Sequence, residues 1–161
     1  MTDVDMTDVD MANRAGGHDR RIVVGVDGSH CSKTALRWAM AQAWRTGATV
    51  EAVNAWQDPV AYGYAPGWTP AMYGGESISV LTQKILDQTV AEVAGQEGRP
   101  SEVLTRVVQG HPAQVLMEAA TGAQLLVVGS RGHGTFAGIL LGSVSQHCVQ
   151  HAPCPVVVVP Q

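Results

Sequence analysis

Charged and aromatic residues are scarce in this sequence, at 15% and 5% of its 161 residues, and it contains one phenylalanine. A hydrophobic core therefore has to be built from aliphatic side chains, and the length fits one domain with a sizeable core. No apolar run approaches the roughly 20 residues that a membrane-spanning helix needs, which argues against a membrane protein. Because the three cysteines are odd in number and follow no spacing pattern, the sequence predicts no disulfide framework.

Basic clusters are also missing. The net charge of −4 comes from the first ten residues, in which the pentapeptide MTDVD occurs twice and supplies four carboxylates. The remaining chain is electrically balanced, which argues against a nucleic-acid groove. We expect the acidic segment 1–19 to be disordered and residues 20–161 to form one domain. The N-terminus lacks the basic start and apolar core of a secretory signal, so the expected location is the cytoplasm.

Residues 124–145, QLLVVGSRGHGTFAGILLGSVS, are the most informative segment that is present. An apolar run stops at Gly129, a glycine-rich loop follows, and a Gly-Ser pair at 142–143 opens a helix. The glycines at 129, 132 and 142 give the spacing G-x2-G-x9-G-S. Such a loop suits phosphate, because glycine lets backbone N–H groups approach an anion and a helix N-terminus adds unpaired donors. A glycine turn needed only for tight packing is the alternative.

Two other phosphate motifs do not fit. A P-loop requires G-x4-G-K-[ST], and no lysine follows Lys84. Residues 132–137 match G-x-G-x-x-[GA], but a dinucleotide fold needs an acidic residue about 20 positions further on. At that distance the chain has Ala152 and Pro153. We therefore interpret this second match as chance.

Strand-like and helix-like segments alternate along the rest of the chain. We predict strands over 21–26, 49–55, 102–108, 125–128 and 156–159, and a long loop over 56–75. We predict helices from Ser29 or Ser32 to Gly47 and over 76–94, 112–119 and 143–150. In the second helix, Ile78, Leu81 and Ile85 recur on one face. This alternation predicts a parallel sheet covered on both faces, with ligands at the carboxyl ends of the strands.

Several polar side chains fall near those strand ends. Asp27 can accept hydrogen bonds from an amino group or from ribose hydroxyls, and it can equally cap the following turn. Arg131 and His133 lie inside the glycine loop, where they either add positive charge for phosphate or face solvent.

Four possible zinc ligands lie within eight residues: His147, Cys148, His151 and Cys154. Their spacing matches no closed zinc pattern, and histidines near a helix C-terminus are favoured by the helix dipole alone. We therefore expect no metal ligands here and interpret Cys148 as a small core residue.

Several motifs together resemble the universal stress protein family. Residues 23–29 are similar to its first strand and acidic turn, 110–113 to the G-x-P-A start of its third helix, and 155–159 to its closing strand. The spacing G-x2-G-x9-G-S is similar to that of the nucleotide-binding members. The resemblance covers nearly all of residues 20–160. One departure is Ala123-Gln124, where the family usually has Ala-Asp; this position precedes the fourth strand.

The resemblance implies a single doubly wound α/β domain with an open five-stranded parallel sheet, strand order 3-2-1-4-5, and helices on both faces. The switch point then falls between the first and fourth strands. It also implies ATP there, with Mg²⁺ held through the phosphates. The residues implied beside adenosine are Gly25, Val26, Asp27, Val53, Val128 and Gly129. Those implied along the phosphates are Gly132, Gly142, Ser143, Val144 and Ser145, with Arg131 of the loop adding charge.

We expect an ATP-binding regulatory protein of the stress response with little or no hydrolysis, because no triad, carboxylate pair or obvious general base stands out. One alternative is an adenylating or ATP-hydrolysing enzyme of the related adenine-nucleotide α-hydrolase-like fold. Those enzymes carry S-G-G-x-D-S after the first strand, where this chain has VDGSH at 26–30. Another alternative is a scaffold that binds AMP or no nucleotide.

The last strand also predicts assembly. Val156–Val159 is apolar, carries no charge and should lie at the sheet edge, where it invites pairing with another strand. We expect a homodimer through this strand, as the resemblance also implies. The alternative is that another segment of the same chain covers the edge.

Overall fold

A computed structural model describes residues 19–57, 77–97, 102–133 and 140–160. The predicted tail, apart from Asp19, and nearly all of the predicted 56–75 loop lie outside these residues. The described elements are β1 (Asp19–Gly25), α2 (His30–Thr46), β2 (Thr49–Trp56), α3 (Ile78–Glu97), β3 (Val103–Gln109), α4 (Pro112–Ala119), β4 (Ala123–Gly129), α5 (Ser143–His151) and β5 (Val156–Val159).

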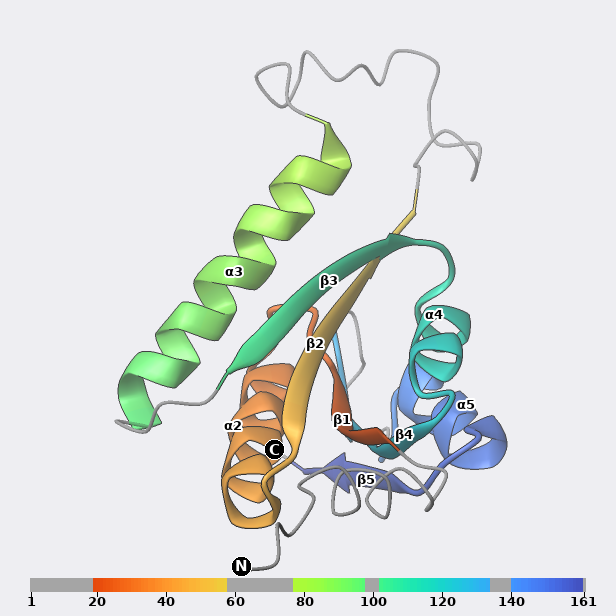
Figure 1. Ribbon diagram of the computed structural model, residues 1–161. Helices are drawn as coiled ribbons and strands as arrows, with labels where there is room; N and C mark the ends of the chain where they lie inside the picture. The colour runs from red at the N-terminus through yellow and green to blue at the C-terminus, as the bar shows by residue number, and fades with distance from the viewer. Residues whose placement is uncertain (1–18, 58–76, 98–101, 134–139, 161) are drawn as a thin grey trace, which may run out of the picture.

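The five strands form one parallel sheet in the order β3-β2-β1-β4-β5, which confirms the predicted α/β class and strand order. Helices α2 and α3 cover one face, and α4 and α5 cover the other (Figure 1). β5 lies at one edge of the sheet and β3 at the other. The chain therefore leaves β1 and β4, two neighbouring strands, toward opposite faces.

Two aliphatic cores follow from this arrangement. The core under α2 and α3 contains Leu36, Met40 and Leu86. The core under α4 and α5 contains Leu126 and Cys148, which confirms Cys148 as a core residue. The central strands are apolar along most of their length because both of their faces are covered.

Helix ends agree with the sequence signals. Ser29 is the N-cap of α2, and Gly47 ends this helix in the left-handed conformation with φ 67°. Pro112 occupies the first turn of α4. Strand β1 begins at Asp19, two residues before the predicted start, and ends at Gly25. No helix in the described parts of the chain is both long and apolar enough to cross a membrane.

The predicted apolar stripe of α3 is not the one that is buried. The buried residues are Leu86, Thr89 and Val93, whereas Ile85 is 52% exposed. Helix α3 packs on β2, β3 and α2, so these contacts fix its rotation about its own axis. Periodicity identified the helix, but of the three stripe residues Ile78 and Leu81 are half-buried and Ile85 is exposed.

Candidate functional site

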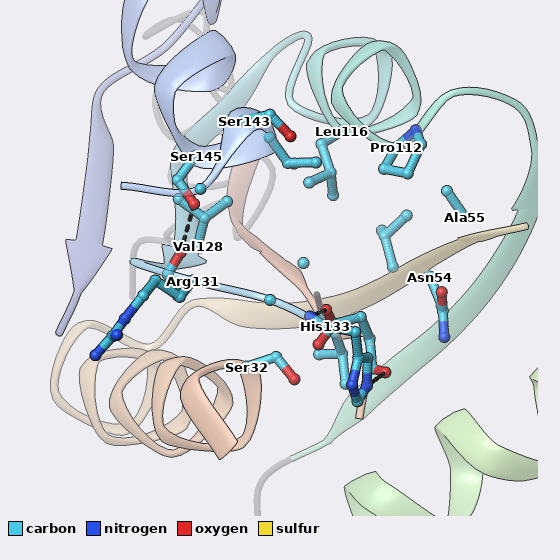
Figure 2. Close-up of a pocket in the computed structure, with 18 residues that line it drawn as sticks. Ser32, Asn54, Ala55, Pro112, Leu116, Val128, Arg131, His133, Ser143 and Ser145 are labelled. Carbon is cyan, nitrogen blue, oxygen red and sulfur yellow. Dashed lines mark hydrogen bonds between the residues drawn. The ribbon is translucent and has the colours of Figure 1, made fainter. Parts of the chain in front are cut away.

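A pocket of about 340 Å³ lies at the carboxyl ends of β1, β2 and β4. It is the crevice expected where adjacent strands send the chain to opposite faces of an open sheet. Its lining, drawn in Figure 2, comprises Gly25, Val26, Asp27, Ser32, Val53, Asn54, Ala55, Pro112, Leu116, Val128, Gly129, Arg131, Gly132, His133, Gly142, Ser143, Val144 and Ser145.

Two glycines, one at the end of β4 and one in the loop that follows, lie in close contact with other parts of the protein. A Cβ on Gly129 would lie 2.8 Å from the backbone carbon of Cys31, at the start of α2. A Cβ on Gly132 would lie 2.7 Å from Oδ2 of Asp27. Both separations are shorter than side chains tolerate, so these glycines let the loop pack against α2 and against the turn after β1.

Gly142 has no such requirement. Its φ of −69° suits any residue. Among the described residues, an added Cβ would have ordinary van der Waals contacts, the nearest at 3.6 Å from Arg131 and Ser130. Since Gly142 lines the pocket, its missing side chain leaves space there that packing against the described residues does not require.

The N-termini of three helices surround the pocket, and they differ chemically. In α2, Oγ of Ser29 accepts a hydrogen bond from the backbone N–H of Ser32 at 3.3 Å. In α4, the first residue is Pro112, which has no N–H to donate. In α5, the N-cap is Gly142, which has no side chain with which to cap the helix. The N-terminus of α5 is therefore the one best suited to an anion.

The two serines of α5 are placed differently. The hydroxyl of Ser145 is buried and donates to the carbonyl of Gly129 at 2.6 Å, which ties α5 to the end of β4 (Figure 2). Its single proton is thus already used within the protein. Ser143 is exposed in the first turn and lines the pocket. Ser143 is therefore the better placed of the two to donate to a ligand.

Asp27 is held at the end of β1 by its own turn. Its Oδ1 accepts from the backbone N–H of Ser29 at 2.9 Å. The residue as a whole is exposed, yet burial of its carboxyl group is the largest influence and raises the pKa. Hydrogen bonds from Ser29 and Ser32, with the nearby His133, outweigh burial, so the pKa lies below the ordinary value of 3.8. Asp27 is therefore an acceptor at neutral pH and caps its own turn, while its contact with a ligand stays a prediction.

Part of the pocket lining is apolar. Val53 and Val128 come from β2 and β4, and Pro112 and Leu116 come from α4. Asn54 of β2 adds a polar side chain to the lining. A pocket that combines apolar side chains with the N-terminus of a helix suits a ligand that joins a flat apolar group to an anion.

All twelve residues predicted for the site line this one pocket. The lining also includes residues outside that set: Ser32, Asn54, Ala55, Pro112, Leu116 and His133. Asn54, Ala55 and His133 are sequence neighbours of predicted residues, so proximity was an available signal. The guanidinium of Arg131 extends away from the other labelled side chains in Figure 2, so it does not face the centre of the pocket.

The described residues contain no group of three or more His, Cys, Asp or Glu side chains able to hold a metal ion. His147 and His151 lie with ring centroids 4.7 Å apart. Burial raises the pKa of the Cys148 thiol to about 11, so it remains a neutral core side chain.

The chain matches the model of the universal stress protein family over residues 19–160. Universal stress protein Rv2623 of Mycobacterium tuberculosis (strain ATCC 25618 / H37Rv) is 42% identical over 142 residues. This match covers 85% of the chain and 44% of that relative. The chain thus spans less than half the length of this relative.

Solved structures share the fold. A universal stress protein described as a complex with cAMP is 29% identical, with a TM-score of 0.59, covering 86% of this chain and 94% of that one. The hypothetical protein MJ0577 is 20% identical, with a TM-score of 0.68, covering 90% and 97%. At that identity, the second likeness concerns the fold alone.

Proposed function

We propose that this chain, which belongs to the universal stress protein family, binds ATP in the pocket between β1 and β4. The base would lie against the apolar side chains of Leu116 and Val128. The phosphates would lie against Gly142 and Ser143, with Mg²⁺ held through the phosphates. In this proposal the chain is a nucleotide-responsive regulator in the stress response.

One observation carries the proposal, namely Gly142 at the start of α5. Neither its backbone conformation nor its neighbours among the described residues demand glycine, and as the N-cap it supplies no side-chain cap to the helix. A phosphate oxygen accepting from the first N–H groups of α5 explains both features. The relative described with cAMP supports an adenine nucleotide, since that ligand also joins adenine to phosphate.

We further propose that binding, rather than turnover, is the function. Asp27 is the one carboxylate in the described lining, and its lowered pKa makes it a weak base at neutral pH. Hydrolysis by the pure protein should be far slower than the median enzyme turnover of about 10 s⁻¹. Phosphate release at enzymatic rates that is lost on a pocket substitution would contradict this assignment.

The direct test is to identify and titrate the ligand. Protein denatured straight after purification should release adenine nucleotide, detected by chromatography. Calorimetry on emptied protein should then give tighter binding for ATP with Mg²⁺ than for AMP, cAMP or GTP. Tighter binding of cAMP would reassign the ligand within the same pocket. Binding of none of them would reject the nucleotide proposal in favour of a scaffold.

We also propose a homodimer through β5. Among the described strands, β5 pairs only with β4. The carbonyls of Pro155 and Val159 accept from Leu126 and Ser130. By alternation, the backbone groups of Val156 and Val158 are directed away from β4, and a second copy of β5 can pair with them.

Light scattering should give the mass of two chains for the wild type. Val158→Pro removes one outward N–H and should give monomers, while Val158→Ala, which shortens the same side chain but keeps the N–H, should remain dimeric. A monomeric wild type, or a dimeric Val158→Pro variant, would show that this edge is not the interface.

A further inference from the structure

His133 joins the two loops that border the pocket. Its Nε2 lies 2.9 Å from the backbone carbonyl oxygen of Asp27. Its backbone N–H donates to Oδ2 of the same residue at 3.4 Å. The two residues are 106 positions apart in the sequence, and these two contacts bring them together beside the pocket, where Figure 2 shows His133. The loop after β4 is thereby attached to the turn after β1, across the crevice where the two strands diverge.

The chemistry of this contact fixes the proton on the ring. A carbonyl oxygen only accepts hydrogen bonds, so Nε2 of His133 must be the donor. The imidazole is therefore either the neutral Nε2–H tautomer or the imidazolium, and the neutral Nδ1–H tautomer is excluded while the contact exists. An aromatic ring without this N–H would fill the same space but leave the carbonyl of Asp27 without its donor.

The surroundings of the contact are built for close approach. A Cβ on Gly28 would lie 4.0 Å from Nε2 of His133, and the φ of Gly28 is 82°, a conformation that favours glycine. The neighbouring Gly132 has no side chain to collide with the carboxylate of Asp27. Gly28 thus meets the backbone requirement of the turn, and Gly132 lets the loop approach the carboxylate of Asp27.

We propose that His133 is a positioning residue for nucleotide binding, and this inference rests on the function proposed above. By donating to Asp27, it holds Gly132 and the start of the loop in the conformation that a nucleotide meets. A loop already fixed in its bound conformation loses less freedom on binding, and this raises affinity. His133 acts here through Asp27 and Gly132, not through a reaction.

Two substitutions separate the hydrogen bond from the shape of the ring. His133→Phe keeps a flat ring but cannot donate, whereas His133→Gln has a side-chain N–H that can reach the same carbonyl. His147→Phe, on the exposed surface of α5 outside the pocket, is the matched control. We expect calorimetry to give about tenfold weaker ATP binding for His133→Phe. His133→Gln should recover most of the lost affinity, and His147→Phe should bind ATP as tightly as the wild type.

Nitrogen-detected NMR of the histidine rings gives an independent readout. His133 should show a protonated Nε2 in the emptied protein. A neutral Nδ1–H tautomer would overturn the proposal, whatever the affinities. Unchanged ATP binding in His133→Phe would overturn the positioning role and leave the proposed function intact. A wild type that binds no nucleotide would overturn both.

Discussion

The first turns of α2 and α5 face the same pocket, yet they are completed in different ways. Ser29 caps α2, and Asp27 in turn accepts from the N–H of Ser29. Gly142 begins α5 without a side-chain cap. A capped helix end is stabilised by its own protein, whereas an uncapped end next to a cavity leaves donors for a ligand. The difference separates the structural side of the pocket from its proposed binding side.

The largest expected effect comes from blocking the open helix end. Gly142→Val should reduce ATP affinity roughly a hundredfold, because losing two hydrogen bonds to a charged phosphate costs about 3 kcal/mol. Gly95→Ala is the control, since an added Cβ there meets nothing within 4 Å and Gly95 does not line the pocket. If both variants fold and calorimetry gives them equal ATP affinities, the phosphates do not bind next to Gly142.

A substitution at Gly129, which packs against the first turn of α2, should instead lower the stability of the fold. Gly129→Ala places a Cβ 2.8 Å from the backbone of Cys31, and overpacking of this kind costs about 1–3 kcal/mol. Gly142→Ala, where the same methyl group has room, should unfold at nearly the wild-type urea concentration. Equal midpoints for the two alanine variants would mean that the loop adapts and that the two glycines are equivalent.

Removing the cap of α2 tests the same distinction with a smaller change. Ser29→Ala should lower the free energy of unfolding by about 1 kcal/mol, because the N–H of Ser32 loses its acceptor. ATP affinity should change less than twofold, since Ser29 does not line the pocket. A variant of unchanged stability but weaker ATP binding would place the binding role on α2 instead.

The smallest expected effect concerns the charge of Asp27. Its pKa is lower in the folded protein than the ordinary 3.8, so the ionised carboxylate stabilises the fold above pH 3.8. This contribution is lost as the pH falls through the folded pKa. Between about pH 6 and pH 3, the free energy of unfolding in urea should therefore fall more for the wild type than for Asp27→Asn. Parallel curves would mean that Asp27 is not stabilised in its charged form.

Much of this fold could be predicted because its signals are local. Apolar runs marked all five strands, and Ser29, Gly47 and Pro112 marked helix ends through their own backbone chemistry. The strand order followed from a resemblance carried by motifs that lie at strand ends. Most of the pocket residues were predicted through the same resemblance, and they lie together because parallel strands bring their carboxyl ends to one side of the sheet.

Other features depend on contacts between residues far apart in the sequence. The buried side of α3 is set by β2, β3 and α2, and the apolar pattern of the helix did not reveal it. Glu51 is buried between Arg21 and Arg106, and no local pattern pairs residues at those distances. Such pairings arise only when the strands take their places in the sheet.

The same division applies to the pocket. By itself, the sequence determined that glycines and hydroxyls follow the fourth strand, since this is a matter of residue type and spacing. Only the tertiary structure decided what each one does: Gly129 and Gly132 allow close packing, Ser145 ties α5 to β4, and Gly142 leaves open space. The physical reason is that a missing side chain or a hydroxyl acquires its role from whatever the fold brings within contact distance.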